Sequence, residues 1–199
     1  MLARRGSIII AVLPIPQIGD PVLRWPTADV SQDDLATDAF QSLIDDMIET
    51  MRDANGAGIA ATQVGVSHSM CIVGVDANRR YPYKPRIPLT VLVNPVIRAL
   101  DGVTYLNNEG CLSVQLRGDL SRFMNIEVSN LDRDGSPVTT RYGGLSAGTV
   151  QHEVDHLAGI LIVDRMHDSR TMSTWDNFSK HHMADYIDRI QPVINQTKP

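Results

Sequence analysis

Apolar positions recur at steps of three and four residues between positions 31 and 55, which predicts an amphipathic helix. Ser31 is a candidate N-cap, and Asn55 followed by Gly56 is typical of a helix C-terminus. We therefore expect one long helix with its apolar stripe, methionines included, packed in the core. The residues of this stripe are Phe40, Leu43, Ile44, Met47, Ile48 and Met51.

Short runs rich in β-branched residues follow this helix and predict strands. One run covers 70–75, and another covers 89–93 beyond a proline-rich, basic loop. Further runs at 126–128 and 138–141 flank the turn sequence DRDG at 132–135. We expect these two runs to form a β-hairpin.

Strands mixed with a few segregated helices, without regular alternation, are typical of an α+β fold. A polar region at 169–191 carries apolar residues at loosely helical spacing, and we expect a terminal helix that Pro192 ends. A length of 199 residues fits a single domain. We expect 1–12 to be an N-terminal extension and 169–199 a C-terminal helical tail.

Composition narrows the classes of function. A net charge of −5 provides no general basic surface, so nucleic acid is not an expected partner. No segment reaches the roughly 18 apolar residues that a membrane span needs, and the apolar stretch 8–13 is too short for a secretion signal. The two cysteines, Cys71 and Cys111, indicate a reducing compartment. We expect a soluble, cytoplasmic protein.

The sequence H-E-x-x-H at 152–156 carries the clearest chemistry in the chain. Residues four apart lie on the same face of a helix, so His152 and His156 can bind one divalent ion. Glu153 lies close enough to handle the proton of a water at that ion. This pattern predicts metal-assisted hydrolysis.

A third protein ligand must complete such a centre. The extended metalloprotease pattern requires a histidine at position 162, where this chain has Ile162. Cys111 is a better candidate, because a thiolate and two imidazoles leave a fourth position open. A single cysteine is by itself more often a small buried apolar side chain. The residues alone therefore leave His167, Asp164 and Asp168 as alternatives.

Three motifs together resemble those of the peptide deformylase family. They read GAGIAATQ at 56–63, EGCLS at 109–113 and QHEVDHL at 151–157, and the similarity extends from about residue 13 to about 165. The resemblance implies a peptide-deformylase-like fold, in which antiparallel β-sheets pack around a central helix that carries H-E-x-x-H. It also implies removal of the N-formyl group from the N-terminal methionine of newly synthesised polypeptides, with release of formate.

The resemblance assigns the residues of the reaction centre. Glu153 would act as general base and then as general acid. Glu109 and Gln151 would orient ligands or shape the pocket. The family usually works with Fe²⁺, which Zn²⁺, Ni²⁺ or Co²⁺ can replace, although the ligand types alone favour zinc. The implied metal ligands are Cys111, His152 and His156.

Other positions are expected to hold the substrate. The resemblance gives the Gln63 side-chain amide and the Leu112 backbone N–H as donors to the oxyanion. The backbone of Ala57 and Gly58 on one side, and of Gly110 on the other, would bind the substrate main chain as an added strand. Glycines suit such a close approach.

The chain departs from the family pattern around the substrate. The loop expected at 114–117 lacks the usual proline and is shorter, which affects the placement of Arg117, the residue similar to a peptide-contacting arginine. Asn107 stands where some relatives have an apolar residue, and 145–150, which in relatives helps to line the methionine pocket, is rich in small residues. We expect a wider, less apolar pocket and a weaker preference for methionine.

The expected partner is an N-formylmethionyl peptide, including nascent chains at the ribosome. We expect a monomer, with a dimer as the alternative. Two other functions stay open at this stage, a metallopeptidase that cleaves internal amides and a catalytically silent metal- or peptide-binding relative. Glu153 argues against the silent relative, because a structural metal site needs no general base.

Overall fold

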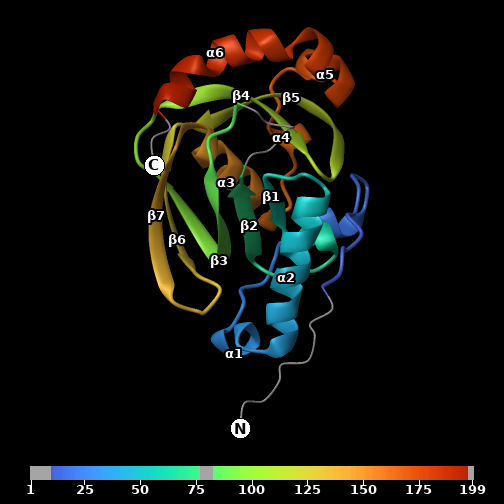
Figure 1. Ribbon diagram of the computed structural model, residues 1–199, viewed down its shortest axis with the longest axis vertical. Coiled ribbons are helices and arrows are strands. Elements are labelled where there is room, and N and C mark those ends of the chain that lie inside the picture. Colours follow the sequence, from blue (N-terminus) through green and yellow to red (C-terminus); the bar gives the residue numbers. More distant parts are fainter. Residues whose placement is uncertain (1–9, 77–82, 197–199) are drawn as a thin grey trace.

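A single helix, α3 (Gly144–Leu157), lies at the centre of the fold with strands of both sheets around it (Figure 1). The computed structural model describes residues 10–76 and 83–196. The predicted extension at 1–12 therefore lies almost wholly outside the described residues. The other helices are α1 (Gln32–Leu35), α2 (Asp38–Asp53), α4 (Ile162–Arg165), α5 (Trp175–His181) and α6 (Met183–Gln196), with short 3₁₀ turns η1 (Pro21–Arg24), η2 (Ala61–Val64) and η3 (Ser169–Thr171).

Two antiparallel sheets are present in the described part of the chain. The larger has five strands in the order β1-β2-β3-β6-β7, so the short β1 is an edge strand. The smaller is the hairpin β4–β5. The strands are β1 (Gly58–Ala60), β2 (Met70–Val75), β3 (Ile87–Ala99), β4 (Thr104–Cys111), β5 (Val114–Phe123), β6 (Asn125–Leu131) and β7 (Pro137–Gly143).

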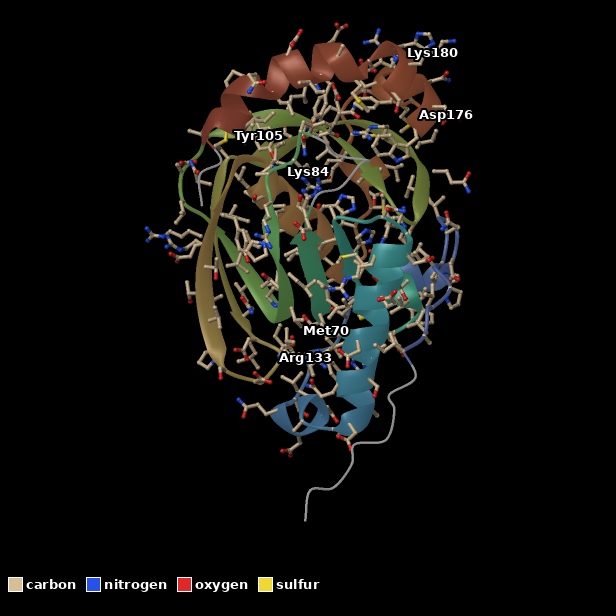
Figure 2. All side chains as sticks on the ribbon, in the orientation of Figure 1. Met70, Lys84, Tyr105, Arg133, Asp176 and Lys180 are labelled. Atoms are coloured by element: carbon tan, nitrogen blue, oxygen red, sulfur yellow. The ribbon has the colours of Figure 1, made fainter. Side chains whose placement is uncertain are left out.

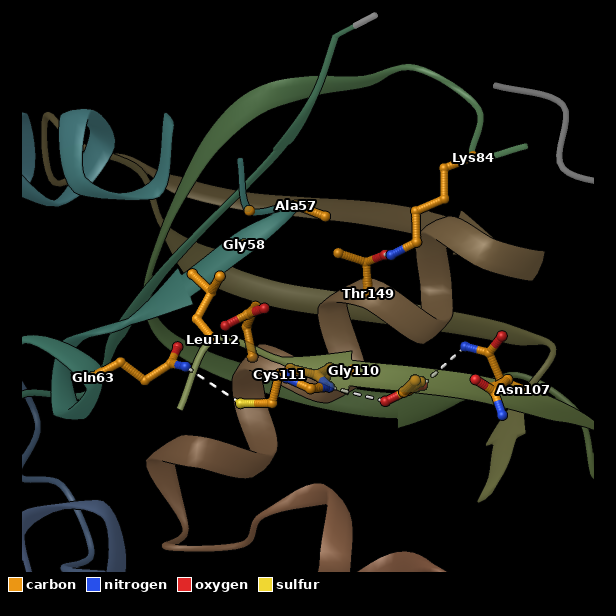
Figure 3. A pocket seen from close by; sticks show the side chains of 14 residues that line it. Ala57, Gly58, Gln63, Lys84, Asn107, Gly110, Cys111, Leu112 and Thr149 are labelled. Atoms are coloured by element: carbon orange, nitrogen blue, oxygen red, sulfur yellow. Dashed lines mark hydrogen bonds and ion pairs between the residues drawn. The ribbon is translucent and has the colours of Figure 1, made fainter. Parts of the chain in front are cut away.

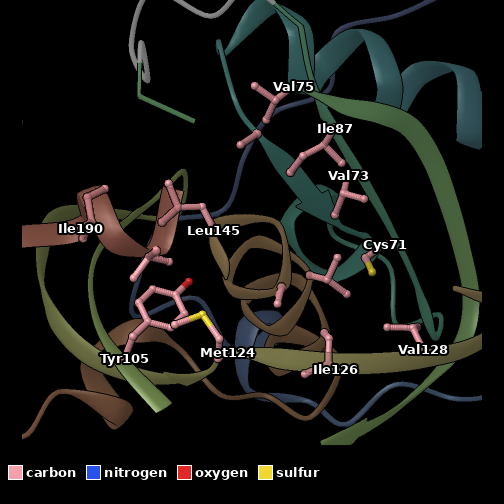
Figure 4. Close-up of a cluster of buried hydrophobic side chains, with 14 of the residues drawn as sticks. Cys71, Val73, Val75, Ile87, Tyr105, Met124, Ile126, Val128, Leu145 and Ile190 are labelled. Carbon is pink, nitrogen blue, oxygen red and sulfur yellow. The ribbon is translucent and has the colours of Figure 1, made fainter. Parts of the chain in front are cut away.

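Side-chain alternation along β2 buries this strand of the larger sheet on both faces. Cys71 and Val73 point to the cluster that packs against α3 (Figure 4), whereas Met70 and Ile72 point to the cluster under α2. A strand covered on both faces reads as a continuous apolar run, as this one does. The α+β prediction, with antiparallel sheets packed around a central H-E-x-x-H helix, is confirmed.

The long helix predicted at 31–55 is two helices. Ser31 caps α1, as predicted, but the Thr37 hydroxyl accepts a hydrogen bond from the Phe40 N–H at 3.2 Å and starts α2. The same hydroxyl donates to the Asp34 carbonyl. These two hydrogen bonds of Thr37 separate α1 from α2. The apolar stripe begins only at Phe40, after this break, so its periodicity gave no sign of the break.

One predicted hairpin is confirmed and another was missed. β6 and β7 pair across the turn at 132–135, and Arg133 in that turn binds Asp45 of α2 at 2.7 Å (Figure 2). The hairpin β4–β5 was not expected, and 114–117 is part of β5 rather than a loop. Its strands are hard to recognise because several buried positions are polar. These are Asn107, Asn108, Glu109, Arg117 and Arg122.

The C-terminal helical tail forms α5 and α6, which cover the β4–β5 sheet at one end of the molecule (Figure 1). The prediction that Pro192 ends the last helix is wrong, because α6 continues to Gln196. Pro192 is exposed, so its ring faces away from the core while the buried Ile190 and Val193 keep the helix packed. No helix in the described ranges is long and apolar enough to cross a membrane.

Gly159 after α3 is expected to be essential for stability. Its φ of +70° is left-handed, and a Cβ there would lie 2.5 Å from the Arg24 carbonyl oxygen. Gly135 has a φ of +82° but ample space, with its nearest neighbour at 3.7 Å. Gly159→Ala should therefore lower the free energy of unfolding by at least about 1 kcal/mol more than Gly135→Ala. Denaturant titration measures both, and equal losses would contradict the packing argument.

Candidate active site

Three potential metal ligands meet where β4 ends against α3. Cys111 is the last residue of β4, and His152 and His156 lie one turn apart on α3. Their ligand atoms all lie within 4.8 Å of one another, and Cys111 Sγ is 3.3 Å from His156 Nε2. A thiolate and two imidazoles are a donor set suited to a divalent transition metal. Among the alternatives, Asp164 is instead paired with Arg24.

A buried charge network holds His152 in place. Its Nδ1–H donates to Glu109 Oε2 at 2.9 Å, which turns Nε2 away from this carboxylate. Arg122 donates to both Glu109 oxygens at 2.8 Å and to Asp155 at 2.6 Å. Burial alone would raise the pKa of Glu109, but Arg122 and His152 hold it well below its usual value. Glu109 thus orients His152, one of the potential ligands, while Arg122 carried no recognisable signal in the sequence.

Glu153 lies beside the ligands with its carboxylate inside the protein. Burial raises the pKa of Glu153 to about 7, against the lowering effect of His152 and Lys84. Its Oε2 atom is buried and has no hydrogen-bond partner among the described residues. The carboxylate packs directly on Gly58, where a Cβ would lie 2.6 Å from Glu153 Cδ. The Glu153 carboxylate therefore occupies the space that a side chain at position 58 would need.

Gln63 reaches the ligands from the 3₁₀ turn after β1 (Figure 3). Its Oε1 accepts from the Ala60 N–H at 2.9 Å, which fixes the amide. Its Nε2 donates to Ser113 Oγ at 3.2 Å and approaches Cys111 Sγ at 3.5 Å. Gln63 is buried, so the amide is a preorganised donor at the ligand cluster.

A cavity of about 40 Å³ runs past this cluster. Ala57 and Gly58 at the β1 edge line one side, and Gly110 and Leu112 line the other (Figure 3). The structure thus brings the predicted substrate-binding backbone segments to opposite walls of one cavity. An extended peptide between them would pair with the free edge of β1.

The wider, less apolar pocket stays a prediction, and the structure shows what surrounds the small residues of α3. Gly148 has no side chain because the Tyr105 hydroxyl occupies that space, donating to the Gly144 carbonyl at 2.9 Å. Lys84 enters the end of the cavity and donates to Thr149 Oγ1 at 3.0 Å. Gly148 of α3 therefore accommodates the Tyr105 side chain.

The comparisons with known proteins agree with this geometry. The model of the polypeptide deformylase family matches residues 12–172. The chain belongs to the polypeptide deformylase family. It is accordingly a hydrolase, a peptide deformylase that removes the N-formyl group from the N-terminal methionine of newly synthesised polypeptides and releases formate.

Individual deformylases match most of the chain. Peptide deformylase 1 of Nitrosomonas europaea is 39% identical over 176 residues, covering 87% of this chain and 99% of its own. A Met-Ala-Ser-bound deformylase structure from Acinetobacter baumannii has a TM-score of 0.76 and 41% identity, covering 79% of this chain and 100% of its own. The deformylase structure from Thermotoga maritima has a TM-score of 0.69 and 32% identity, covering 79% of this chain and 99% of its own.

Arg117 does not reach the cavity of this deformylase, which corrects the expectation of direct peptide contact. Its side chain is only 1% exposed, and its guanidinium lies 4.0 Å from the Trp175 ring and 3.7 Å from the Phe178 ring. It donates to the Asn108 side chain at 2.6 Å and to the Asn108 carbonyl at 3.0 Å. Arg117 thus packs between β4 and α5, where its hydrogen bonds to Asn108 support β4. Gln151 likewise binds the β5 backbone at Phe123 rather than a ligand.

Replacing Gly58 by alanine should displace the Glu153 carboxylate without removing a metal ligand. We expect kcat for formate release to fall by at least about a hundredfold, since a displacement of about 1 Å is that costly to catalysis. Metal content, measured by elemental analysis, should be retained. Gly102→Ala is the control, because a Cβ there meets no atom within 4 Å. A Gly58→Ala enzyme with normal kcat would show that Glu153 does not need this contact.

Proposed function

We propose that Cys111, His152 and His156 hold the metal ion of this deformylase and that Glu153 transfers the protons of the reaction. The observation that carries the proposal is a buried Glu153 carboxylate beside a cluster of one cysteine and two histidine side chains. Burial raises the pKa of this carboxyl to about 7, and its Oε2 has no hydrogen-bond partner among the described residues. A base with a pKa near the working pH is the most effective. When bound, a divalent ion acts as a Lewis acid and lowers the pKa of water.

The proposed native ion is Fe²⁺, with Zn²⁺, Ni²⁺ or Co²⁺ able to replace it. One thiolate and two imidazoles can bind each of these ions, although the donor types alone favour zinc. The resemblance to deformylases supports iron. Cys111 is buried, and the Ser113 N–H donates to its Sγ at 3.4 Å.

Glu153 would remove a proton from the attacking water as the water oxygen bonds to the formyl carbon. The C–N bond then breaks, and Glu153 delivers that proton to the departing amine nitrogen. The products are a free N-terminus and formic acid, which loses its remaining acidic proton to give formate. The Gln63 side-chain amide and the Leu112 backbone N–H would stabilise the negative oxygen formed in between. The fixed orientation of Gln63 and the position of Leu112 on the cavity wall support these roles.

The proposed substrate is an N-formylmethionyl peptide, bound between Ala57 and Gly58 on one wall and Gly110 on the other. The free edge of β1 supports this placement, as does the Acinetobacter baumannii relative with bound Met-Ala-Ser. We further propose that nascent chains at the ribosome supply this substrate and that the enzyme acts in the cytoplasm as a monomer. Two free, buried cysteines fit such a reducing compartment.

Glu153→Gln tests the proposed proton transfer. The variant keeps the size of the side chain and should retain the metal, but formate release from formyl-Met-Ala-Ser should fall by about 10²- to 10⁴-fold. Protein loaded with ferrous iron or nickel without oxygen is assayed for formate, with elemental analysis of the same samples. Glu49→Gln on the exposed face of α2 is the control. An unchanged rate in Glu153→Gln would remove Glu153 from the mechanism.

A further inference from the structure

The guanidinium of Arg117 lies against two aromatic rings of the C-terminal tail, Trp175 and Phe178, here called the aromatic pair. Its central carbon is 4.0 Å from the centre of the Trp175 ring and 3.7 Å from that of the Phe178 ring. The two rings meet edge to face at 5.9 Å, and the cation contacts both of them. The Arg117 side chain is fully buried, and attraction between a cation and an aromatic face is strongest where water is excluded.

The aromatic pair belongs to a part of the chain that the family model does not cover. Trp175 and Phe178 lie three residues apart on one face of α5, whereas the family match ends at residue 172. Ser173, just before this helix, exchanges two backbone hydrogen bonds with Arg117, each of 2.9 Å. The tail is thus attached to β5 at Arg117 through both the backbone and the side chain.

Arg117 connects this attachment to β4, the strand that carries one wall of the cavity. Its Nε donates to Asn108 Oδ1 at 2.6 Å, and its Nη2 donates to the Asn108 carbonyl at 3.0 Å. Gly110 is the cross-strand partner of Arg117. A Cβ built on Gly110 would lie 3.8 Å from Trp175 Nε1 and 3.9 Å from Arg117 Nη1. Gly110 therefore packs against both side chains and also lines the cavity (Figure 3).

A peptide that binds as an added strand depends on the rigidity of the backbone that receives it. Backbone groups held in place beforehand bind more tightly, because ordering them during binding costs free energy. The contacts of Cys111, the next residue, are separate from the aromatic pair. Its side chain packs with Leu120 and Leu161, and its Sγ accepts from the Ser113 N–H. Loosening Gly110 should therefore weaken peptide binding without releasing the metal.

We propose that Trp175 and Arg117 are positioning residues that hold Gly110 in the conformation that receives the substrate main chain. The C-terminal tail of this deformylase would then help to determine substrate affinity. This inference rests on the proposed function, which places Gly110 at the substrate. Neither side chain lines the cavity, so the pair should affect KM much more than kcat.

A comparison of two substitutions at Trp175 tests the role of the aromatic ring. In the iron- or nickel-loaded enzyme, Trp175→Leu should raise KM for formyl-Met-Ala-Ser about tenfold, the size expected of a buried cation–π contact. Its kcat should change by less than about twofold, and elemental analysis should show full metal content. Trp175→Phe keeps a ring beside the cation and should keep KM within about threefold of the original value. Trp25→Leu, at an exposed tryptophan, is the matched control and should change neither constant.

Arg117→Met tests whether Trp175 acts through Arg117. In this background, Trp175→Leu should raise KM by less than about a further twofold, because the contact is already absent. Independent, multiplying effects would overturn the inference. Equal effects of Trp175→Leu and Trp175→Phe would also overturn it, and this comparison is decisive even if Arg117→Met does not fold.

Peptide binding separates this inference from the proposed function. Calorimetric affinity for the product peptide Met-Ala-Ser does not depend on turnover, and Trp175→Leu should weaken it by the same factor of about ten. An unchanged affinity would overturn the inference even if formyl peptides are hydrolysed normally. A weakened affinity that Trp175→Phe restores, in an enzyme that releases no formate, would support the inference and count only against the proposed function.

Discussion

The structure depends on the burial of charge around one helix. α3 carries two imidazoles and a carboxylate into the interior, and each would be costly there without a partner. Arg122 of β5 offsets part of this cost, because its guanidinium binds Glu109 and Asp155 at once, and Glu109 in turn holds His152. Glu153 Oε2 and His156 Nδ1 have no hydrogen-bond partner among the described residues. Removing one member of such a network leaves an uncompensated buried charge, which typically costs about 3–5 kcal/mol. The pairs that Arg122 and Glu109 form thus hold the β4–β5 hairpin against α3 and also fix the orientation of the His152 ring.

Close packing around the cavity follows from this arrangement. Glu153 needs the space that Gly58 leaves, and Tyr105 needs the space that Gly148 leaves. Neither glycine has a positive φ, so backbone conformation is not the reason for either of them. The contact with Gly58 places the carboxylate of the general base candidate against the edge strand that would receive the substrate. Recognition of the main chain and positioning of the carboxylate are therefore coupled.

Much of the site could be predicted from the sequence, because its chemistry is local or lies in short motifs. The spacing of His152 and His156 needs only a helix, and Cys111 was found within a family motif. The hairpin that carries Cys111 could not be predicted, since its polar residues are buried by partners distant in sequence. Lys84 was missed for the same reason: its segment shows only a proline-rich loop, and Thr149, its partner, is 65 residues away.

The shape of the pocket could not be predicted from the sequence for a different reason. Small residues at 145–150 suggested open space, but residue size does not show which neighbour fills that space. Here Tyr105 does so, and Asn107 is fixed from α6 through Tyr186, beyond the part of the chain that matches the family. Packing between elements far apart in the sequence determines cavity shape, and no local pattern records it.

The central claim, that one thiolate and two imidazoles hold the metal, is tested most directly by X-ray absorption spectroscopy of the iron- or nickel-loaded protein. The account predicts a first coordination shell with one sulfur and two imidazole nitrogens, and loss of the sulfur contribution in Cys111→Ala. A shell without sulfur, or one unchanged by Cys111→Ala, would contradict it.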